Sequence, residues 1–187
     1  NILITGIHGF VGGNIVAALK NQHNIYGLDI VSPQKDGVVK TYLWDELEQI
    51  SFVDMIIHLA GKAHDTKNQS NAQVYFDINT GLTQKIFDWF LTSNASKFIF
   101  FSSVKAAADQ VDSDILTEDV VPAPKGPYGE SKLAAERYIL GHLPSPDFSL
   151  RYASPFDTPR TRGYSGSGLG TWNLELGTKK SSFFALV

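Results

Sequence analysis

Short apolar runs alternate with longer amphipathic stretches along the first 150 or so residues. Most of these runs are apolar on both faces, which is typical of parallel strands covered by helices on both sides. The pattern predicts strands at 1–5, 24–30, 38–44, 55–60, 97–103 and 148–152, and helices at 10–20, 72–93 and 127–140. A short helix capped by Asp45 should follow the third strand. The alternation predicts an α/β domain built on a doubly wound parallel sheet.

The composition and the hydrophobic periodicity of the sequence change after residue 152. Residues 153–187 are rich in Gly, Ser, Thr and Pro and show no sustained helical or strand period. A chain of 187 residues is long enough for one well-buried domain but short for two. We therefore predict one domain over 1–152 and a truncated or irregular segment over 153–187.

Composition excludes several classes of protein. The net charge of −3 gives no electrostatic reason to expect nucleic acid or an acidic membrane as partner. The chain has no Cys, so disulfides and thiol catalysis are excluded and a cytoplasmic location is expected. The five His residues show no metal-binding spacing, so no metal is expected. No apolar run approaches the roughly 18 residues that span a bilayer, so no membrane span is expected.

A glycine-rich turn follows the first predicted strand. In ILITGIHGFVGGNIV, Gly6, Gly9 and Gly12 stand at GxxGxxG spacing between a strand and a helix. A tight turn, close approach of backbone to a diphosphate and close helix packing each select glycine. The amides at the start of the helix would then face the phosphates. The alternative, an incidental turn, does not explain this strand and helix context.

An acidic residue ends the second predicted strand, about 20 residues beyond the glycines. Asp29 can accept hydrogen bonds from both hydroxyls of an adenosine ribose, whereas it would repel a 2'-phosphate. The nearest following cation in the sequence is Lys35. We therefore expect NAD rather than NADP as the cofactor, with Asp29 as an ordinary turn residue the alternative.

A tyrosine and a lysine stand four residues apart in GPYGESKLAAE (126–136). Positions i and i+4 share one face of a helix, so Tyr128 and Lys132 should lie side by side. Taken alone, the pair is typical of a half-buried Tyr packing on the stem of an exposed Lys. With a bound cofactor nearby, the same pair indicates chemistry.

Together with TGIHGFVG (5–12) and Asp29, the segments HLAG (58–61), NTG (79–81), FFSS (100–103), PYGESK (127–132) and LRYASP (150–155) occur in an order that resembles one family. It is the extended short-chain dehydrogenase/reductase family, in its NAD-dependent epimerase/dehydratase branch that acts on nucleotide sugars. The resemblance covers about residues 1–155 and implies a Rossmann fold, usually followed by a C-terminal substrate domain. That substrate domain is expected to be missing or reduced here.

The resemblance implies a role for each motif. The HLAG loop should lie beneath the ribose and nicotinamide, Asn79 should lie near the active site, and His58 is expected to be a hydrogen-bonded strand-end residue. Ser102 is expected to face the core or the cofactor. The expected catalytic residues are Ser103, Tyr128 and Lys132. The expected cofactor-binding residues are Gly6, Gly9, Phe10, Val11, Gly12, Asp29, Leu59, Ala60, Gly61, Tyr128 and Lys132.

These residues suggest a reaction. The Lys132 ammonium and an oxidised nicotinamide would favour the phenolate form of Tyr128, which could take a proton from a sugar hydroxyl while Ser103 hydrogen-bonds the oxygen. Family dehydratases carry an acidic residue just after the catalytic Ser, where this chain has Val104 and Lys105. We therefore favour a nucleotide-sugar epimerase, with a ketoreductase or a dehydratase as alternatives.

The sequence also departs from the family pattern. Ala107 and Ala108 replace a common Tyr-Gly pair, and Ser154 and Asp157 replace residues common in UDP-galactose 4-epimerases. The basic residues beyond them, which could contact a diphosphate or be merely solvated, are Arg160, Arg162, Lys179 and Lys180. We expect the 187-residue chain to be catalytically incomplete, which leaves an NAD-binding module without sugar turnover as the second hypothesis. A homodimer stays open.

Overall fold

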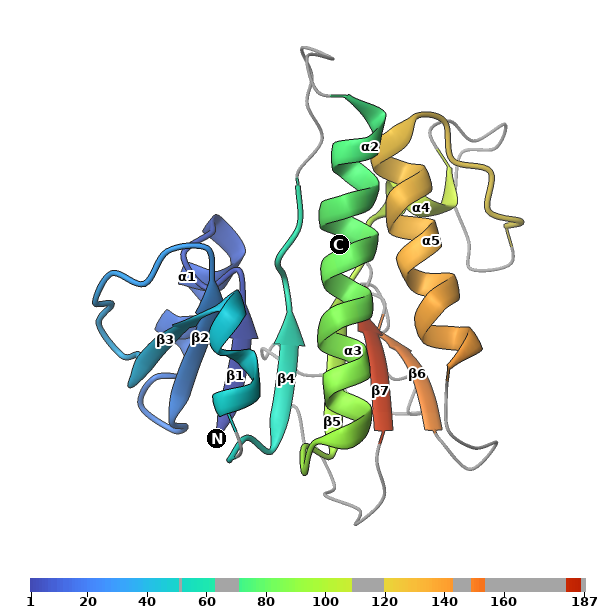
Figure 1. The fold of residues 1–187 in the computed structure, drawn as a ribbon. Coiled ribbons are helices and arrows are strands. Elements are labelled where there is room, and N and C mark those ends of the chain that lie inside the picture. Colours follow the sequence, from blue (N-terminus) through green and yellow to red (C-terminus); the bar gives the residue numbers. More distant parts are fainter. Residues whose placement is uncertain (51, 63–70, 109–119, 143–148, 154–180, 186–187) are drawn as a thin grey trace, which may run out of the picture.

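The computed structural model describes residues 1–50, 52–62, 71–108, 120–142, 149–153 and 181–185 (Figure 1). Their strands are β1 (Ile2–Thr5), β2 (Ile25–Asp29), β3 (Lys40–Leu43), β4 (Met55–His58), β5 (Lys97–Phe101), β6 (Ser149–Ala153) and β7 (Ser181–Ala185). Their helices are α1 (Phe10–Leu19), the 3₁₀ helix η1 (Trp44–Gln49), α2 (Ala72–Tyr75), the π-helix η2 (Phe76–Gly81), α3 (Leu82–Thr92), α4 (Val104–Ala107) and α5 (Pro127–Gly141).

The strands form one sheet in which every pair is parallel. The strand order is β3-β2-β1-β4-β5-β7-β6. The register places Thr5 beside His58, and His58 beside Phe100. Because parallel strands end at the same edge, the segments that follow β1, β4 and β5 leave the sheet side by side. Ligand sites of doubly wound sheets lie at this carboxyl edge.

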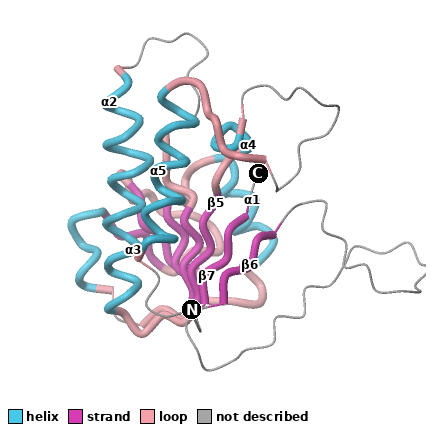
Figure 2. Tube along the Cα trace, turned by 90° about the vertical axis from the view of Figure 1, so that its right-hand side faces the viewer, coloured by secondary structure: helices cyan, strands magenta, loops and turns pink. Residues whose placement is uncertain are grey.

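Helices cover both faces of the sheet, as Figure 2 shows, with α2, α3 and α5 on one face and α1 on the other. Alternate residues of β1 therefore enter two separate cores. Leu3 belongs to the core beneath α3 and α5, whereas Ile2 and Ile4 pack with Val16 of α1. The two cores confirm the predicted doubly wound α/β sheet.

Most predicted elements are confirmed, and the structure corrects the prediction in a few places. The predicted cap Asp45 is wrong: η1 begins at Trp44, and the carboxylate of Glu46 accepts the N–H of Leu43 at 2.8 Å. Helix α4 was not predicted because four residues carry no period. Strand β7 lies in the segment expected to be irregular, and its pairing with β5 and β6 is a long-range contact that no local pattern reveals. The division at residue 152 remains a prediction.

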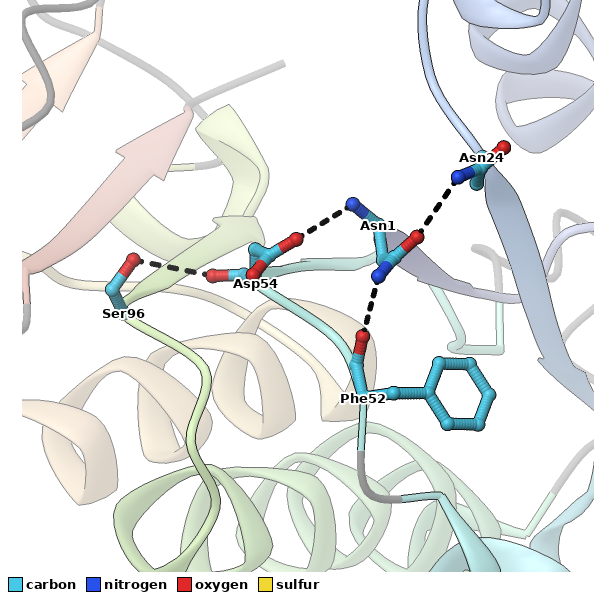
Figure 3. A network of polar contacts seen from close by, with 5 residues as sticks. All are labelled: Asn1, Asn24, Phe52, Asp54 and Ser96. Atoms are coloured by element: carbon cyan, nitrogen blue, oxygen red, sulfur yellow. Dashed lines mark hydrogen bonds and ion pairs between the residues drawn. The ribbon is translucent and has the colours of Figure 1, made fainter.

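Polar side chains tie the strands together at the opposite edge of the sheet (Figure 3). The side chain of Asn1 donates to the carbonyl of Phe52 at 2.8 Å and accepts from Asn24 at 3.1 Å. The Asn1 amino group lies 2.7 Å from Oδ2 of Asp54, whose carbonyl accepts from Ser96 at 3.3 Å. These contacts link the starts of β1, β2, β4 and β5. Within the part of the chain described, no helix is both long and apolar enough to cross a membrane.

Candidate functional site

The glycine loop after β1 is shaped by close backbone contacts. Gly6 has φ of +68°, and a Cβ there would lie 2.9 Å from the backbone of Ala60. A Cβ at Gly12 would lie 2.6 Å from the carbonyl oxygen of Gly6, and one at Gly9 would lie 3.2 Å from the same oxygen. Gly6 is therefore required by conformation and by space, and Gly12 by space, while a Cβ at Gly9 would make a tight contact that needs a small shift of its neighbour. The predicted need for glycine at these positions has a direct steric cause.

The start of α1 faces outward from this loop. Gly9 caps the helix without a side-chain hydrogen bond, so the first amide groups of α1 have no partner within the helix. Phe10 is 88% exposed and Val11 is also exposed, so neither covers the helix end. Positive partial charge and free amides at an open helix start suit a diphosphate group. The cradle therefore fits the phosphates of a dinucleotide.

Asp29 lies beside the glycine loop at the end of β2. Its Oδ2 accepts the N–H of His8 at 3.0 Å, and its Oδ1 accepts the N–H of Ile30 at 2.8 Å. A carboxylate has about four acceptor positions, so both oxygens can still accept from ribose hydroxyls. The Nζ atom of Lys35 lies 3.6 Å from where a Cβ of Gly13 would be, which brings that ammonium to the first turns of α1. Lys35, the cation considered above for the choice between NAD and NADP, thus lies near the predicted cofactor site.

The loop after β4 is held by one hydroxyl of β1. Oγ1 of Thr5 accepts the N–H groups of Leu59 at 3.1 Å and Ala60 at 3.0 Å. A Cβ at Gly61 would lie 2.9 Å from Oδ1 of Asn79. Leu59, Ala60 and Gly61 are therefore fixed against the glycine loop on one side and η2 on the other. Their expected place beneath the ribose and nicotinamide remains a prediction.

His58 is fully engaged and neutral. Its Nδ1 lies 2.6 Å from Oγ1 of Thr5, and its Nε2 lies 2.9 Å from Oγ1 of Thr83. Both Thr5 lone pairs already accept amides, so Thr5 must donate to Nδ1, and the ring proton must be on Nε2. Burial, helped by the charge of Lys132, lowers the pKa of His58 to about 3. The expectation of a hydrogen-bonded strand-end histidine, rather than a base, is confirmed.

The buried hydrogen bonds continue from η2 to α5. Thr83 donates to the carbonyl of Asn79 at 2.6 Å, and Nδ2 of Asn79 donates to Oγ of Ser131 at 3.0 Å. Ser131 in turn donates to the carbonyl of Tyr128 at 2.8 Å. Asn79 lies on a π-helix, a rare element that often occurs at functional sites. Asn79, which is 1% exposed, thus links the loop after β4 to the first turn of α5.

Ser103 caps the short helix α4 immediately after β5. It is buried, and its Oγ accepts the N–H of Lys105, an interaction that leaves the hydroxyl hydrogen available to donate. A Cβ at Gly129 would lie only 2.3 Å from the carbonyl oxygen of Lys105. The turn that carries Ser103 therefore packs directly on the turn that carries Tyr128. Ala108, where the sequence departs from the family pattern, forms an isolated parallel β-bridge with Ala123.

Tyr128 lies in the first turn of α5. The helix begins at Pro127, as predicted, after Gly126 with φ of +90°. The Tyr128 ring is half-buried and meets the ring of Tyr75 edge to face, with centroids 6.3 Å apart. Tyr75 comes from α2, so the phenol packs against α2, next to the turn of α5 that meets α4 at Gly129.

Lys132 is not an exposed lysine. It is 7% exposed, and its Nζ donates to the carbonyl of Phe101 at 2.6 Å and lies 4.2 Å from the ring centroid of Phe100. Burial lowers the pKa of Lys132 to about 8, and the charge of Glu136 opposes that fall. The alternative of an exposed Lys supporting a Tyr ring is therefore wrong. The ammonium stays mainly charged at neutral pH at the carboxyl end of β5.

One pair near the site was missed by the sequence analysis. Ser102 donates to a carboxylate oxygen of Glu136 across the interface between β5 and α5. Glu136 stands four residues after Lys132, and this acidic i+4 spacing is the signal that could have revealed it. Ser102 was expected to face the core or the cofactor, and it faces this carboxylate.

Other residues singled out in the sequence are not described by the structure. Ser154, Asp157 and the four basic residues of 153–187 lie outside the described residues. A hollow of about 550 Å³ lies on α5, and none of the predicted site residues lines it. Its lining residues are Phe76, Pro122, Pro124, Glu130, Leu133, Ala134 and Arg137.

Comparison with known proteins identifies the family. The model of the NAD dependent epimerase/dehydratase family matches residues 2–156. A UDP-glucose 4-epimerase of Vibrio cholerae is 30% identical over 152 residues, covering 75% of this chain and 46% of that protein. A GDP-6-deoxy-D-mannose reductase of Pseudomonas aeruginosa is 27% identical over 165 residues, covering 83% and 51%. The chain spans about half the length of the curated relatives it matches.

Solved structures share the fold. MoeE5 in complex with UDP-glucose and NAD aligns with a TM-score of 0.69 at 24% identity, covering 81% of this chain and 54% of that one. A short-chain dehydrogenase/reductase superfamily protein from Agrobacterium tumefaciens with bound NAD aligns with a TM-score of 0.65 at 26% identity, covering 82% and 49%. Fold, glycine loop and family match agree: the chain belongs to the NAD-dependent epimerase/dehydratase family.

Proposed function

We propose that this chain carries the chemistry of an NAD-dependent nucleotide-sugar 4-epimerase. The observation that carries the proposal is the direct packing of the Ser103 turn on the Tyr128 turn, with Lys132 buried one helical turn further along α5. Both turns lie at the sheet edge that also holds the glycine loop. Relatives named UDP-glucose 4-epimerase support a UDP-sugar as the substrate.

The cofactor would be held by backbone and by one carboxylate. The open cradle of Gly6, Gly9 and Gly12, with the amides of Phe10 and Val11, suits the diphosphate. Asp29 suits the adenosine ribose, and the loop of Leu59, Ala60 and Gly61 suits the nicotinamide end, near Tyr128 and Lys132. When bound, NAD supplies a hydride acceptor that can later return the hydride to the same sugar carbon.

Tyr128 would move the proton that balances this hydride. Its phenolate oxygen takes the proton of the sugar hydroxyl as the carbon beneath gives up its hydrogen with both electrons, which leaves a keto sugar. Ser103 donates a hydrogen bond to the same sugar oxygen. The Lys132 ammonium favours the phenolate form. After the keto sugar rotates, the hydride would return to the opposite face of the same sugar carbon, and Tyr128 would return the proton to the sugar oxygen.

The residues after Ser103 favour epimerisation over dehydration. A dehydratase needs a further proton donor or acceptor, and Val104 and Lys105 supply no carboxyl group there. A ketoreductase remains the alternative, supported by the likeness to a GDP-6-deoxy-D-mannose reductase. Asp29 argues against the NADPH that reductases of this kind usually consume.

A second candidate is a module that binds NAD without converting a sugar. The observation that favours it is the composition of residues 153–187, which offer few periodic apolar positions from which to build a substrate lobe. Positioning of the sugar nucleotide can supply several kcal/mol of the barrier, so residues that hold the uridine and diphosphate are as necessary as the catalytic residues. Calorimetry with NAD, followed by a coupled UDP-glucose/UDP-galactose interconversion assay, separates the two. Binding with turnover supports the epimerase, binding alone supports the module, and no binding rejects both.

A further inference from the structure

A half-buried carboxylate, Glu136, follows the buried ammonium of Lys132 on α5. Glu136 lies one helical turn beyond Lys132, on the same face of the helix. Ser102, 6% exposed at the end of β5, donates to Glu136 across the interface. Ser102 is adjacent to Phe101, whose carbonyl accepts the Lys132 ammonium at 2.6 Å. The side chains of Lys132 and Glu136 therefore contact consecutive residues, Phe101 and Ser102, at the end of β5.

The other neighbours of the ammonium are too weak to hold a charge in this interior. The Phe101 carbonyl and the Phe100 ring, 4.2 Å from Nζ, offer partial charges only. Burial of a charged amine without a counter-charge is costly. Burial lowers the pKa of Lys132, and Glu136 is the group that opposes this effect.

We propose that Glu136, fixed by the Ser102 hydroxyl, is a positioning residue that supplies the counter-charge of the buried Lys132. Burial raises the pKa of Glu136, while Ser102, Lys132 and Arg137 lower it. The hydroxyl thus helps keep the carboxylate ionised, and the carboxylate helps keep the ammonium ionised. Glu136 does not need to touch a substrate for this role.

Other titratable groups lie on the elements packed against α5. Besides His58 of β4, which is neutral, the elements packed against α5 carry Tyr75 on α2, Asp77 on η2, Lys85 and Asp88 on α3 and Lys105 on α4. Asp77 accepts from Gln73, and Asp88 accepts from Tyr138. Lys132 acts on the pKa of Glu136 and is acted on by it, which singles out this pair.

The consequence for catalysis rests on the proposed function. A Lys132 that lost its charge would no longer favour the phenolate form of Tyr128. Ser102 and Glu136 would then set the upper pH limit of activity without taking part in proton transfer. The charge on Lys132 can be measured directly, so the inference can be tested without any turnover.

The test is the titration of Lys132 in the folded 187-residue protein. Isotope-labelled lysine reports protonation through the Cε chemical shift, and Lys132→Arg assigns the signal. Glu136→Gln keeps the shape and the hydrogen bond from Ser102 but removes the charge. We expect the pKa of Lys132 to fall from about 8 by about one unit or more. Glu130→Gln, an exposed carboxylate on the same helix, is the matched control and should leave the titration unchanged.

Ser102→Ala gives an independent reading if Glu136→Gln does not fold. Loss of the hydroxyl should lower the Lys132 titration by less than Glu136→Gln does, and it should add nothing in the Glu136→Gln background. A titration of Lys132 that is unchanged or raised in the folded variants would overturn the proposal. Absent NAD binding or sugar turnover in the unmodified protein would reject the proposed function instead and leave this titration intact.

Discussion

Gly129 lies so close to Lys105 that a Cβ at Gly129 would stand 2.3 Å from the Lys105 carbonyl oxygen. The glycine follows Tyr128 on α5, and Lys105 belongs to the turn that Ser103 caps. The absence of a side chain at Gly129 therefore sets how near the two turns can come. A position that reads as a neutral helix residue in the sequence fixes the separation of the two proposed catalytic groups.

Gly129→Ala should destabilise the protein and disturb the site. The added methyl group must push α4 away from α5, because the opposing atom is backbone, and overpacking of this kind costs about 1–3 kcal/mol. Gly141→Ala is the matched control on the same helix, since among the described residues no atom beyond its own stretch of helix lies within 4 Å of its Cβ position. Urea unfolding should show a loss of stability for Gly129→Ala and none for Gly141→Ala. Equal effects would contradict the steric account.

Tyr128→Phe should abolish proton transfer while leaving the cofactor site intact. In any sugar-active form of the protein, turnover should fall by about 10² to 10⁴-fold, the usual range for a general acid or base. The affinity for NAD, measured by calorimetry, should change much less. Near-normal turnover would assign the base to another residue.

The sequence predicted those features that depend on local pattern. Strands such as Ile2–Thr5 and the glycine turn after it follow from short-range periodicity and from backbone demands at Gly6 and Gly12. The buried state of Lys132 did not follow, because an i, i+4 pair does not reveal which way the helix faces.

Features that depend on distant contacts were missed. The Ser102–Glu136 pair joins residues 34 apart, and β7 forms only through pairing with other strands. Asp45 was a reasonable cap by residue type, but Glu46 reaches back to Leu43, and the helix starts two residues earlier than a cap at Asp45 would place it. The catalytic roles of Ser103, Tyr128 and Lys132 remain predictions.

Thr5→Val should loosen the loop after β4. It removes the oxygen that accepts the amides of Leu59 and Ala60 and the hydrogen that His58 accepts. Unpaired buried groups cost about 1–3 kcal/mol each, so the free energy of unfolding should fall by at least about 2 kcal/mol, and NAD should bind more weakly. Thr5→Ser keeps the hydroxyl and should lose only about 1 kcal/mol, for the methyl group. Equal losses in the two variants would show that the hydroxyl is not the holding group.

Acid should destabilise the protein through His58. The folded-state pKa of about 3 lies below the ordinary value of 6.5, so between these values the unfolded chain binds the extra proton. Stability from this group is complete above about pH 6.5 and is lost as pH falls, by about 1.4 kcal/mol per unit. His58→Gln should flatten the pH dependence of urea unfolding between about pH 7 and pH 5, whereas the exposed control His23→Gln should not. An unchanged slope in His58→Gln would contradict the buried neutral state.

Asp29→Ala should weaken NAD binding and relax the choice between NAD and NADP. The carboxylate is expected to accept from the ribose hydroxyls and to repel a 2'-phosphate. Lys35→Ala belongs in the same series because its ammonium lies near the first turns of α1. If the unmodified protein binds NADP measurably, Lys35→Ala should weaken that binding, while NAD binding should change less. A stronger NADP preference in Lys35→Ala would exclude that ammonium as the phosphate contact.

The most direct test of the NAD-dependent site is calorimetric titration of the 187-residue protein with NAD and with NADP under identical conditions. The open glycine cradle and Asp29 predict one saturable site that binds NAD more tightly than NADP. Equal or tighter binding of NADP, or no saturable binding of NAD, would contradict the proposed cofactor site and the chemistry built on it.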